Sequence, residues 1–244
     1  MNHIFLISII ATLISIIATF IIIVSLFILT GKNLIKKTKK KETNQAKSIV
    51  LLPKPLLLGE LSIEEALWER RSVRNYKTES LQLKEISQLL WAAQGITEDE
   101  GKRTAPSAGA LYPLEVYLVT GNVDNLVSGV YHYRPRDQSL QQIAEGDKRN
   151  QLSGAALMQG SIRDCSAIIV FAADFHRTTK KYFEKGRDYV YIEVGHAAQN
   201  VLLQATSLHI GAVTVGAFIQ SLAKKILQLP KNEDPLYLLP LGKM

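Results

Sequence analysis

A short basic run, Arg70-Arg71-Ser72-Val73-Arg74, combines residue types that suit an anionic ligand. In an extended chain Arg70, Ser72 and Arg74 point the same way, because side chains alternate along a strand. Arg71 then turns aside. Guanidinium groups bind phosphate in a fork, and a hydroxyl adds a donor. The charge pattern is equally compatible with a solvated basic helix end, since cations are favourable near a helix C-terminus.

Other stretches have the composition of a cofactor site. The loop Pro106–Ala110 has small side chains, which let backbone amides approach a flat ring closely, as glycine does at ligand sites. Gly216-Ala217-Phe218 offers a similar approach, and Lys243 near the end of the chain would supply a phosphate contact. Taken singly, each stretch is also compatible with an ordinary turn.

Common catalytic and nucleotide-binding motifs are absent from the sequence. There is no G-x-x-x-x-G-K-[ST] phosphate loop and no G-x-S-x-G nucleophile elbow. Gly211–Gly216 does not fit the G-x-G-x-x-G dinucleotide turn. The histidines and the single cysteine show no paired spacing, so we expect no metal site. Cys165 precedes the apolar run 167–173 and is predicted to be a buried structural thiol.

The net charge of +7 is concentrated at the N-terminus. Residues 1–47 hold seven lysines and one glutamate, which leaves +1 for the rest of the chain. A nearly neutral folded part argues against a nucleic-acid-binding surface. The 244 residues, 47% hydrophobic and 21% charged, predict one sizeable domain with attachments.

The N-terminal segment is predicted to anchor the chain in a membrane. Ile4–Leu29 has no charged residue and exceeds the roughly 30 Å hydrocarbon core at about 1.5 Å per residue. A cleaved signal peptide would have a cationic start and a shorter apolar core. We expect a retained single-pass anchor at 1–30 and a basic, proline-containing linker at 31–60. The lysines after the span place residues 32–244 in the cytoplasm by the positive-inside rule.

Residues 61–244 carry the patterns of one α+β domain, in which helices flank mainly hairpin-linked strands. Ser62 with Glu65 three residues later predicts a capping box, and Gly95 predicts the end of the next helix. Hydrophobic periodicity predicts helices at 62–70, 83–94, 147–158, 187–208 and 219–228. It predicts strands at 115–120, 129–134, 139–144, 167–173, 212–218 and 236–239.

Longer motifs in residues 60–244 resemble the nitroreductase superfamily, specifically its SagB-type (ThcOx-like) dehydrogenase branch. They are RRSVRNY, PSAGALYPLEVYLV, GVYHYRP, a KY pair followed by GRDYVYIEVGHAAQNVLLQA, GAVTVGAF and the terminal LPLGK. PSAGALYPLE followed by VGHAAQN is specific, whereas RRSVRNY is short. The resemblance implies an antiparallel-rich sheet with helices, built as an intertwined homodimer with two FMN sites at the interface.

The resemblance also implies cofactor-binding roles for particular residues. The row that binds the FMN phosphate, ribityl chain and ring edge corresponds to Arg70, Ser72 and Arg74, with Arg71 beside them. The loop that lines the flavin, often from the second subunit, corresponds to Pro106, Ser107, Ala108 and Gly109. The segment beside the ring corresponds to Val215, Gly216 and Ala217. The terminal phosphate contact corresponds to Lys243.

In azoline-oxidising members a Lys-Tyr pair serves proton transfer, and the resemblance implies this role for Lys181 and Tyr182. A lysine acts as a base where burial or another cation lowers its pKa, and Lys180 is adjacent. The surrounding sequence is equally typical of an exposed lid. Glu193 and Asn200 share one helix face and match the family pattern; we assign them to packing or the dimer rather than to chemistry.

The predicted function is a membrane-tethered, FMN-dependent oxidoreductase that transfers a hydride to or from a small organic or peptide-derived substrate. One version oxidises a thiazoline or oxazoline in a modified peptide. The other reduces quinones or nitroaromatics with NAD(P)H as electron donor. A third alternative is a non-catalytic, flavin-binding membrane scaffold.

Overall fold

The computed structural model describes residues 48–244. The predicted anchor at 1–30 and most of the predicted linker lie outside the described residues. Within the described part of the chain, no helix is both long enough and apolar enough to cross a membrane.

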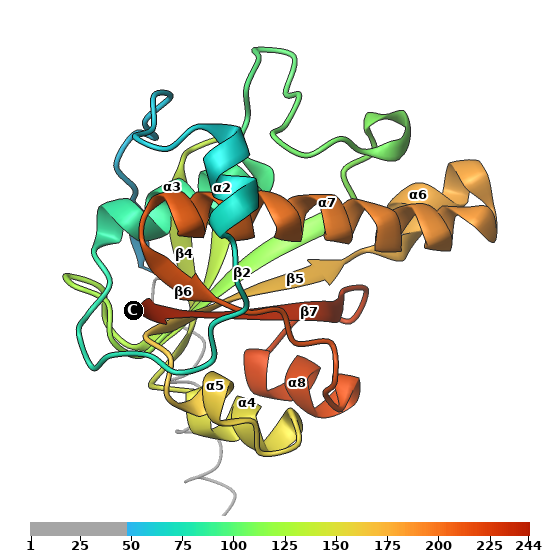
Figure 1. Cartoon of the computed structure of the whole chain (residues 1–244). Coiled ribbons are helices and arrows are strands. Elements are labelled where there is room, and N and C mark those ends of the chain that lie inside the picture. The colour runs from blue at the N-terminus through green and yellow to red at the C-terminus, as the bar shows by residue number, and fades with distance from the viewer. Residues whose placement is uncertain (1–47) are drawn as a thin grey trace, which may run out of the picture. The chain divides into compact units, whose positions relative to one another are not determined.

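A seven-stranded antiparallel sheet lies at the centre, in the order β1-β4-β3-β2-β5-β7-β6 (Figure 1). Its strands are β1 (Ile49–Leu51), β2 (Leu114–Thr120), β3 (Gly129–Arg134), β4 (Ser139–Glu145), β5 (Ala167–Ala173), β6 (Ile210–Ala212) and β7 (Asp234–Lys243). β7, the last strand in sequence, lies between β5 and β6. The order therefore places the C-terminal strand inside the sheet, between β5 and the short edge strand β6.

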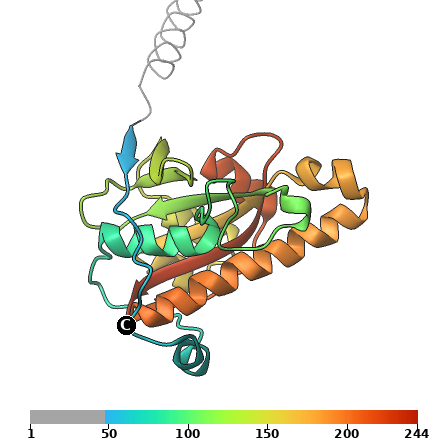
Figure 2. The same cartoon turned by 90° about the horizontal axis from the view of Figure 1, so that it is seen from above.

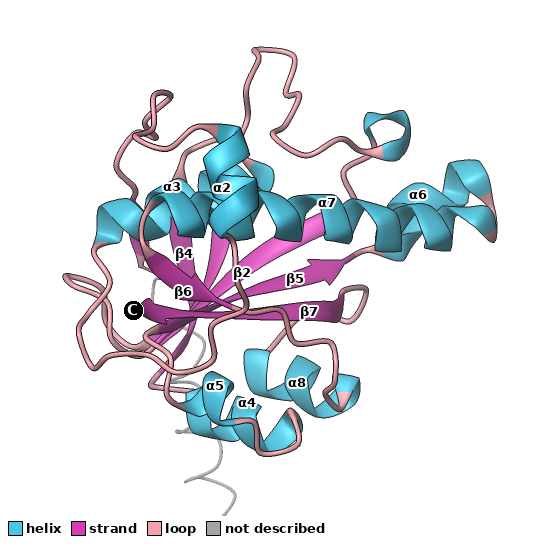
Figure 3. Ribbon diagram, in the orientation of Figure 1, coloured by secondary structure: helices cyan, strands magenta, loops and turns pink. Residues whose placement is uncertain are grey.

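Helices cover both faces of this sheet, as Figure 3 shows. The elements associated with the first face are α2 (Ile63–Glu69), α3 (Leu83–Gln94), η1 (Ala108–Ala110), α6 (Phe175–Tyr182) and α7 (Lys185–Ser207). On the other face lie α4 (Arg149–Ala155), α5 (Gly160–Arg163) and α8 (Gln220–Leu227). α3 and α7 run side by side across the sheet (Figure 2), and α2 and α6 pack against α7.

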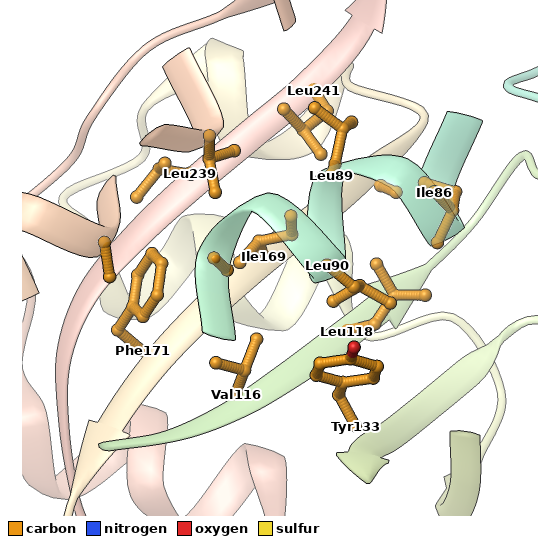
Figure 4. Packing of buried hydrophobic residues seen from close by; sticks show 14 of the residues in the cluster. Ile86, Leu89, Leu90, Val116, Leu118, Tyr133, Ile169, Phe171, Leu239 and Leu241 are labelled. Carbon is orange, nitrogen blue, oxygen red and sulfur yellow. The ribbon is translucent and has the colours of Figure 1, made fainter. Parts of the chain in front are cut away.

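Each face of the sheet has its own hydrophobic cluster. β5 is buried throughout, and its residues alternate between the two clusters. Ile169 and Phe171 join the cluster under α3 and α7, whereas Ile168 and Val170 join the other. Figure 4 shows the first cluster, in which Leu89 of α3 packs over the strands. Because helices cover both faces, β5 has the continuous apolar sequence of a buried strand.

Several local predictions are confirmed. The Ser62 hydroxyl accepts from the Glu65 amide at 3.1 Å, and the Glu65 carboxylate accepts from the Ser62 amide at 2.8 Å. This capping box begins α2, and Gly95 follows the end of α3. The predicted hairpin is formed by β3 and β4. Cys165 is buried, and burial raises the pKa of its thiol to about 12, which disfavours the reactive thiolate.

The predicted linker boundary at residue 60 differs from the structure. Ile49–Leu51 forms β1 and pairs with β4, so residues before 60 belong to the folded domain. Ile49 and Val50 are β-branched and favour a strand, while Pro53 cannot continue a ladder. A short apolar stretch after the lysines therefore extends the sheet.

The predicted strand at 212–218 is wrong beyond Ala212. The β6–β7 ladder ends one residue short of Pro240. Pro240 has no amide to donate, and its carbonyl accepts from the Tyr76 hydroxyl at 3.3 Å. The chain therefore leaves the sheet and returns for an isolated bridge at Val215.

The bounds of two further elements, α4 and β7, differ from the prediction. α4 stops at Ala155 because Leu157 and Met158 adopt positive φ values of 57° and 61°, which end a right-handed helix. β7 covers Asp234–Lys243 rather than 236–239, because it pairs with β5 along most of its length.

Candidate functional site

The basic run is extended beside β6, as its pattern predicts. Ser72 forms a parallel bridge with Ala212, and the Val73 amide donates to the Ala212 carbonyl at 2.9 Å. Val73 packs against Gly211, where an added Cβ would lie 2.7 Å from the valine Cγ1. Since side chains alternate, Ser72 and Arg74 turn the other way, and both are exposed.

The Arg71 guanidinium hydrogen-bonds the backbone at the C-terminal end of α2. Its Nη1 donates to the carbonyl oxygens of Trp68 and Arg70, both at 2.8 Å. Carbonyls at a helix C-terminus lack intrahelical partners, so a cation is favourable there. The helix-end interpretation therefore holds for Arg71. Arg70 and Arg74, by contrast, have no carboxylate partner among residues 48–244.

Arg74 borders a hollow of about 500 Å³. The other lining residues are Asn75, Tyr76, Gln159, Gly160, Ser161 and Asp164. Guanidinium, amide and hydroxyl donors of this kind suit an oxyanion. The Asp164 carboxylate pairs with Arg163 at 2.8 Å, which offsets its charge. The polar residues of α5 belong to no motif, so sequence reasoning did not find them.

The Val215-Gly216-Ala217 segment lies beside β7 and close to this hollow. Val215 is buried and bridges Leu238, whereas Gly216 and Ala217 are exposed. Gln159 connects the segment to the hollow, because its side-chain amide donates to the Ala217 carbonyl at 3.2 Å. The structure thus brings the predicted ring-side segment near Arg74.

Lys243 is placed differently from the rest of the predicted phosphate contacts. Its Nζ lies 2.5 Å from Glu85 Oε1 of α3. α3 covers one face of the sheet, whereas α5, which borders the Arg74 hollow, covers the other (Figure 1). The structure therefore does not bring the Lys243 ammonium into the hollow, and its phosphate contact stays a prediction.

The Pro106–Ala110 loop meets the predicted Lys-Tyr pair. Gly109 has a φ of 63°, and an added Cβ there would lie 2.8 Å from Tyr182 Oη and 3.0 Å from Lys181 Nζ. The left-handed backbone favours glycine, and an added Cβ would displace the ends of the Lys181 and Tyr182 side chains. The structure thus joins two predicted parts of the site that are distant in sequence.

The Lys-Tyr pair ends α6 and is accessible. Lys181 is exposed, with its Nζ 5.3 Å from the centroid of the Tyr182 ring. Tyr182 is half-buried, and its ring lies edge-on to the Tyr189 ring, with the two ring centroids 5.2 Å apart. Lys181 has no carboxylate partner within the described chain. Its ammonium is therefore available to a ligand.

Arg177 anchors α6 to the sheet. Its guanidinium donates to the Tyr112 carbonyl at 3.0 Å and to the Glu115 carboxylate at 2.5 Å. Glu115 also hydrogen-bonds His132 of β3 at 2.7 Å. Burial raises the pKa of Glu115, but the hydrogen bonds from His132 and Arg177 outweigh burial and hold that pKa below its usual value. This ionised carboxylate fixes the start of the helix that carries Lys181.

Ser107 links the loop to a buried acid. Its hydroxyl donates to Glu193 Oε2 at 2.6 Å and accepts from the Tyr112 amide at 2.9 Å. The Glu193 side chain belongs to α7, and the residue is only 2% exposed. Burial raises its pKa to about 7, against the opposing effects of the Ser107 hydrogen bond and the Arg103 charge. The helical spacing of α7 located Glu193 on a face but gave no sign of this contact.

The predicted site residues form two groups along α7. The basic run lies beside β6, which follows the C-terminal end of α7. The Pro106–Ala110 loop and the Lys-Tyr pair lie near its N-terminal half. The stretch from Glu193 to Ser207 alone is about 21 Å long at the helical rise of about 1.5 Å per residue. One chain therefore does not gather all of these residues into one pocket.

Comparisons with known proteins agree with this architecture. The model of the nitroreductase family matches residues 67–243. A Methanocaldococcus jannaschii protein whose name assigns it to the nitroreductases is 44% identical over 186 residues, covering 76% of this chain and 93% of that protein. The microcin B17-processing protein McbC of Escherichia coli is 29% identical, and the match covers 54% of this chain and 50% of McbC. The NADPH-flavin oxidoreductase of Vibrio harveyi is 29% identical over 43% of this chain and 47% of its own length.

Solved structures share the fold. A crystal structure from Anabaena variabilis, described as a nitroreductase, superposes with a TM-score of 0.72 at 27% identity, over 81% of this chain and 42% of that one. A chain in the Escherichia coli microcin synthetase McbBCD complex with truncated pro-MccB17 bound superposes with a TM-score of 0.62 at 25% identity, over 83% and 80%.

Proposed function

Because the chain belongs to the nitroreductase family, we propose that it is an FMN-dependent oxidoreductase acting on a small organic or peptide-derived substrate. Oxidoreductase activity agrees with the family and with the flavin oxidoreductase relative. Similarity to McbC agrees with the SagB-like branch. The single observation that carries the assignment of FMN is the extended row of Arg70, Ser72 and Arg74, in which Arg70 is half-buried, Ser72 and Arg74 are exposed, and Arg74 borders the polar hollow.

The residues of this row fit the anionic end of FMN. Arg70 and Arg74 have no carboxylate partner within residues 48–244, and Ser72 adds an exposed hydroxyl. Such donors bind phosphate through charge-assisted hydrogen bonds. When bound, FMN supplies the hydride chemistry, while the protein supplies orientation and proton control.

We infer that each site combines two copies of the chain. One copy supplies the basic run, and its partner supplies the Pro106–Ala110 loop with Lys181 and Tyr182. The separation of these groups along α7 supports this arrangement, as do exposed apolar side chains on α2 and α7. Large exposed apolar groups commonly mark protein interfaces.

Lys181 is the proposed proton-transfer residue, with Tyr182 beside it. Its exposed ammonium lies against Gly109 of the loop proposed to line the flavin. Lys181→Ala is expected to slow turnover and to leave flavin bound. Lys180→Ala removes the same charge from the preceding, also exposed, position and serves as the matched control. Equal rates in the two variants would remove the catalytic role.

We favour a modified peptide as substrate. McbC is named as a microcin-processing protein, and the similar complex holds a truncated pro-peptide. In this version Lys181, as its neutral amine, would accept the proton that an azoline ring loses on becoming the aromatic azole, and bound FMN would supply the hydride acceptor. The similarity to an NADPH-flavin oxidoreductase supports the alternative, reduction of quinones or nitroaromatics with NAD(P)H. The flavin-binding scaffold is the remaining, non-catalytic alternative.

We also propose that residues 4–29 tether the protein to a membrane with the catalytic domain in the cytoplasm. The uncharged apolar run and the lysines that follow it support this topology. A membrane-bound assembly or a membrane-soluble substrate would suit such a tether.

The first experiment is purification of the full chain in detergent. We expect a yellow protein that releases FMN on denaturation. A colourless protein that cannot be reconstituted with FMN would overturn the enzyme assignment. Adding NADH or NADPH to the oxidised protein then separates the alternatives: bleaching supports the NAD(P)H-dependent reductase, whereas no bleaching by either favours substrate oxidation with another electron acceptor.

A further inference from the structure

Glu193 is buried with incomplete hydrogen bonding. Its Oε2 accepts from Ser107, whereas its Oε1 is buried without a partner among the described residues. A buried charged carboxylate with one neutral donor is unfavourable, so burial favours the protonated form. This explains why its pKa is raised to about 7, where small changes of pH alter its charge.

Ser107 connects the Glu193 carboxyl, and hence its protonation state, to a strained loop. It donates to Glu193 and accepts from the Tyr112 amide, so it joins both ends of the segment 107–112 to α7. Ala110 and Tyr112 have positive φ values of 54° and 46°, which residues with a Cβ adopt only when other contacts hold them. Gly109, between these positions and Ser107, lies against the Lys-Tyr pair.

Few charged groups face the Glu193 carboxyl. Arg103, from the loop after α3, opposes the rise in its pKa. His196 of α7 lines the same hollow of about 280 Å³, together with Pro106, Ala108, Tyr189 and Ile192. From α6, Lys181 and Tyr182 reach the far side of the loop at Gly109.

We propose that Glu193 is a positioning residue: through Ser107 its neutral carboxyl holds the Pro106–Ala110 loop against Lys181 and Tyr182, and loss of its proton loosens that arrangement. The neutral acid can accept from Ser107 with one oxygen and donate with the other. The carboxylate can only accept: it keeps the Ser107 hydrogen bond, but its buried Oε1, which has no partner among the described residues, then carries charge and draws water or the Arg103 and His196 side chains into the packing beside the loop. The inference rests on the proposed function, because it concerns the same Lys-Tyr pair.

The test uses the full chain in detergent, reduced with dithionite, and measures the rate at which a water-soluble quinone reoxidises it. Between pH 6 and pH 8.5 the rate in the wild type should fall on the order of tenfold, because a group with a pKa of about 7 is then largely deprotonated. Glu193→Gln keeps a neutral acceptor for Ser107, and its rate should not show this inflection near pH 7. Glu69→Gln, on the exposed end of α2, is the matched control and should keep it.

Alanine variants of Glu193 and Ser107 distinguish a role in positioning the loop from a role in packing alone. Glu193→Ala and Ser107→Ala should both slow reoxidation by roughly 10- to 100-fold, as small misplacements near reacting groups do, while flavin stays bound. An unchanged inflection in Glu193→Gln, or full activity in both truncated variants, would overturn the proposal.

A flavin-independent measurement keeps this result distinct from the proposed function. The infrared carbonyl band of a protonated carboxyl should titrate near neutral pH in the wild type and be missing from Glu193→Gln. Absence of the band at pH 6 overturns the inference. A band that titrates in a protein unable to hold FMN would support the role of Glu193 while rejecting the proposed function.

Discussion

At the scale of residues, the candidate site depends on side chains that have no internal partner. Arg70 and Arg74 lack a carboxylate within residues 48–244, whereas the adjacent Arg71 is used by α2. The sequence shows three similar cations, and their neighbours decide which remain available. Lys243 shows the same effect, because Glu85 already binds its ammonium.

Arg74→Ala should weaken FMN retention without unfolding the domain. Losing one charge-assisted hydrogen bond costs about 1.5–3 kcal/mol, which is roughly 10- to 100-fold in the dissociation constant. Fluorescence of FMN released during equilibrium dialysis measures the change. Arg136→Ala, an exposed arginine in the turn between β3 and β4, is the control. Equal FMN occupancy in both variants would remove Arg74 from the site.

Glu193→Gln should stabilise the protein in a pH-dependent way. Burial raises the folded-state pKa from 4.5 to about 7, so the folded state binds the proton more tightly than the unfolded state. The free energy of unfolding therefore falls as pH rises from about 4.5 to 7, and the whole cost is present above 7. The difference in the free energy of unfolding between the variant and the wild type should therefore be up to about 3 kcal/mol more favourable to the variant at pH 8.5 than at pH 4.5. Denaturant titrations of both proteins at both pH values measure this. A difference between variant and wild type that is the same at pH 4.5 and pH 8.5 would contradict the prediction.

At the scale of elements, the Lys-Tyr pair depends on how α6 and the Pro106–Ala110 loop are held. Arg177 binds α6 to the carbonyl of Tyr112 and to Glu115 in β2. Ser107 binds the other side of the same loop to α7. Two helices and a strand thus meet at one strained segment, which therefore has little freedom to move independently.

Gly109→Ala should disrupt this meeting point. The new Cβ would lie 2.8 Å from Tyr182 Oη, and a left-handed residue other than glycine costs roughly 1–2 kcal/mol. We expect slower turnover with FMN still bound at the basic run. Gly154→Ala in α4 meets nothing within 4 Å and provides the matched control. Turnover that is equal in the two variants would argue against a role for the loop.

At the scale of the whole molecule, the separation of the two groups along α7 predicts sites shared between subunits. Arg74→Ala and Lys181→Ala chains carrying different tags can be co-expressed and isolated as mixed dimers. In a shared arrangement one of the two sites receives both intact residues, so about half of the wild-type turnover should return. If each site lay within one chain, both sites of the mixed dimer would contain one substitution. The mixed dimer would then be as slow as the two homodimeric variants.

The sequence predicted the parts of this architecture that depend on local pattern. The capping box at Ser62 and the apolar run of β5 have short-range signatures, and both are confirmed. β1 was missed because three apolar residues between lysines and Pro53 become a strand only beside β4. The Ser107–Glu193 contact joins positions 86 residues apart, so no spacing within either segment could reveal it.

The two edges of the sheet carry a consequence for how the protein avoids self-association. β1 and β6 are each three residues long, and the bridge at Ser72 covers part of β6. Short edges offer few unpaired amides for another molecule to extend, which protects a sheet against aggregation. β4, immediately inside β1, has seven residues. A fragment that begins after Leu51 would therefore replace a short edge with a long one, and its solubility would suffer although every residue of the candidate site remained.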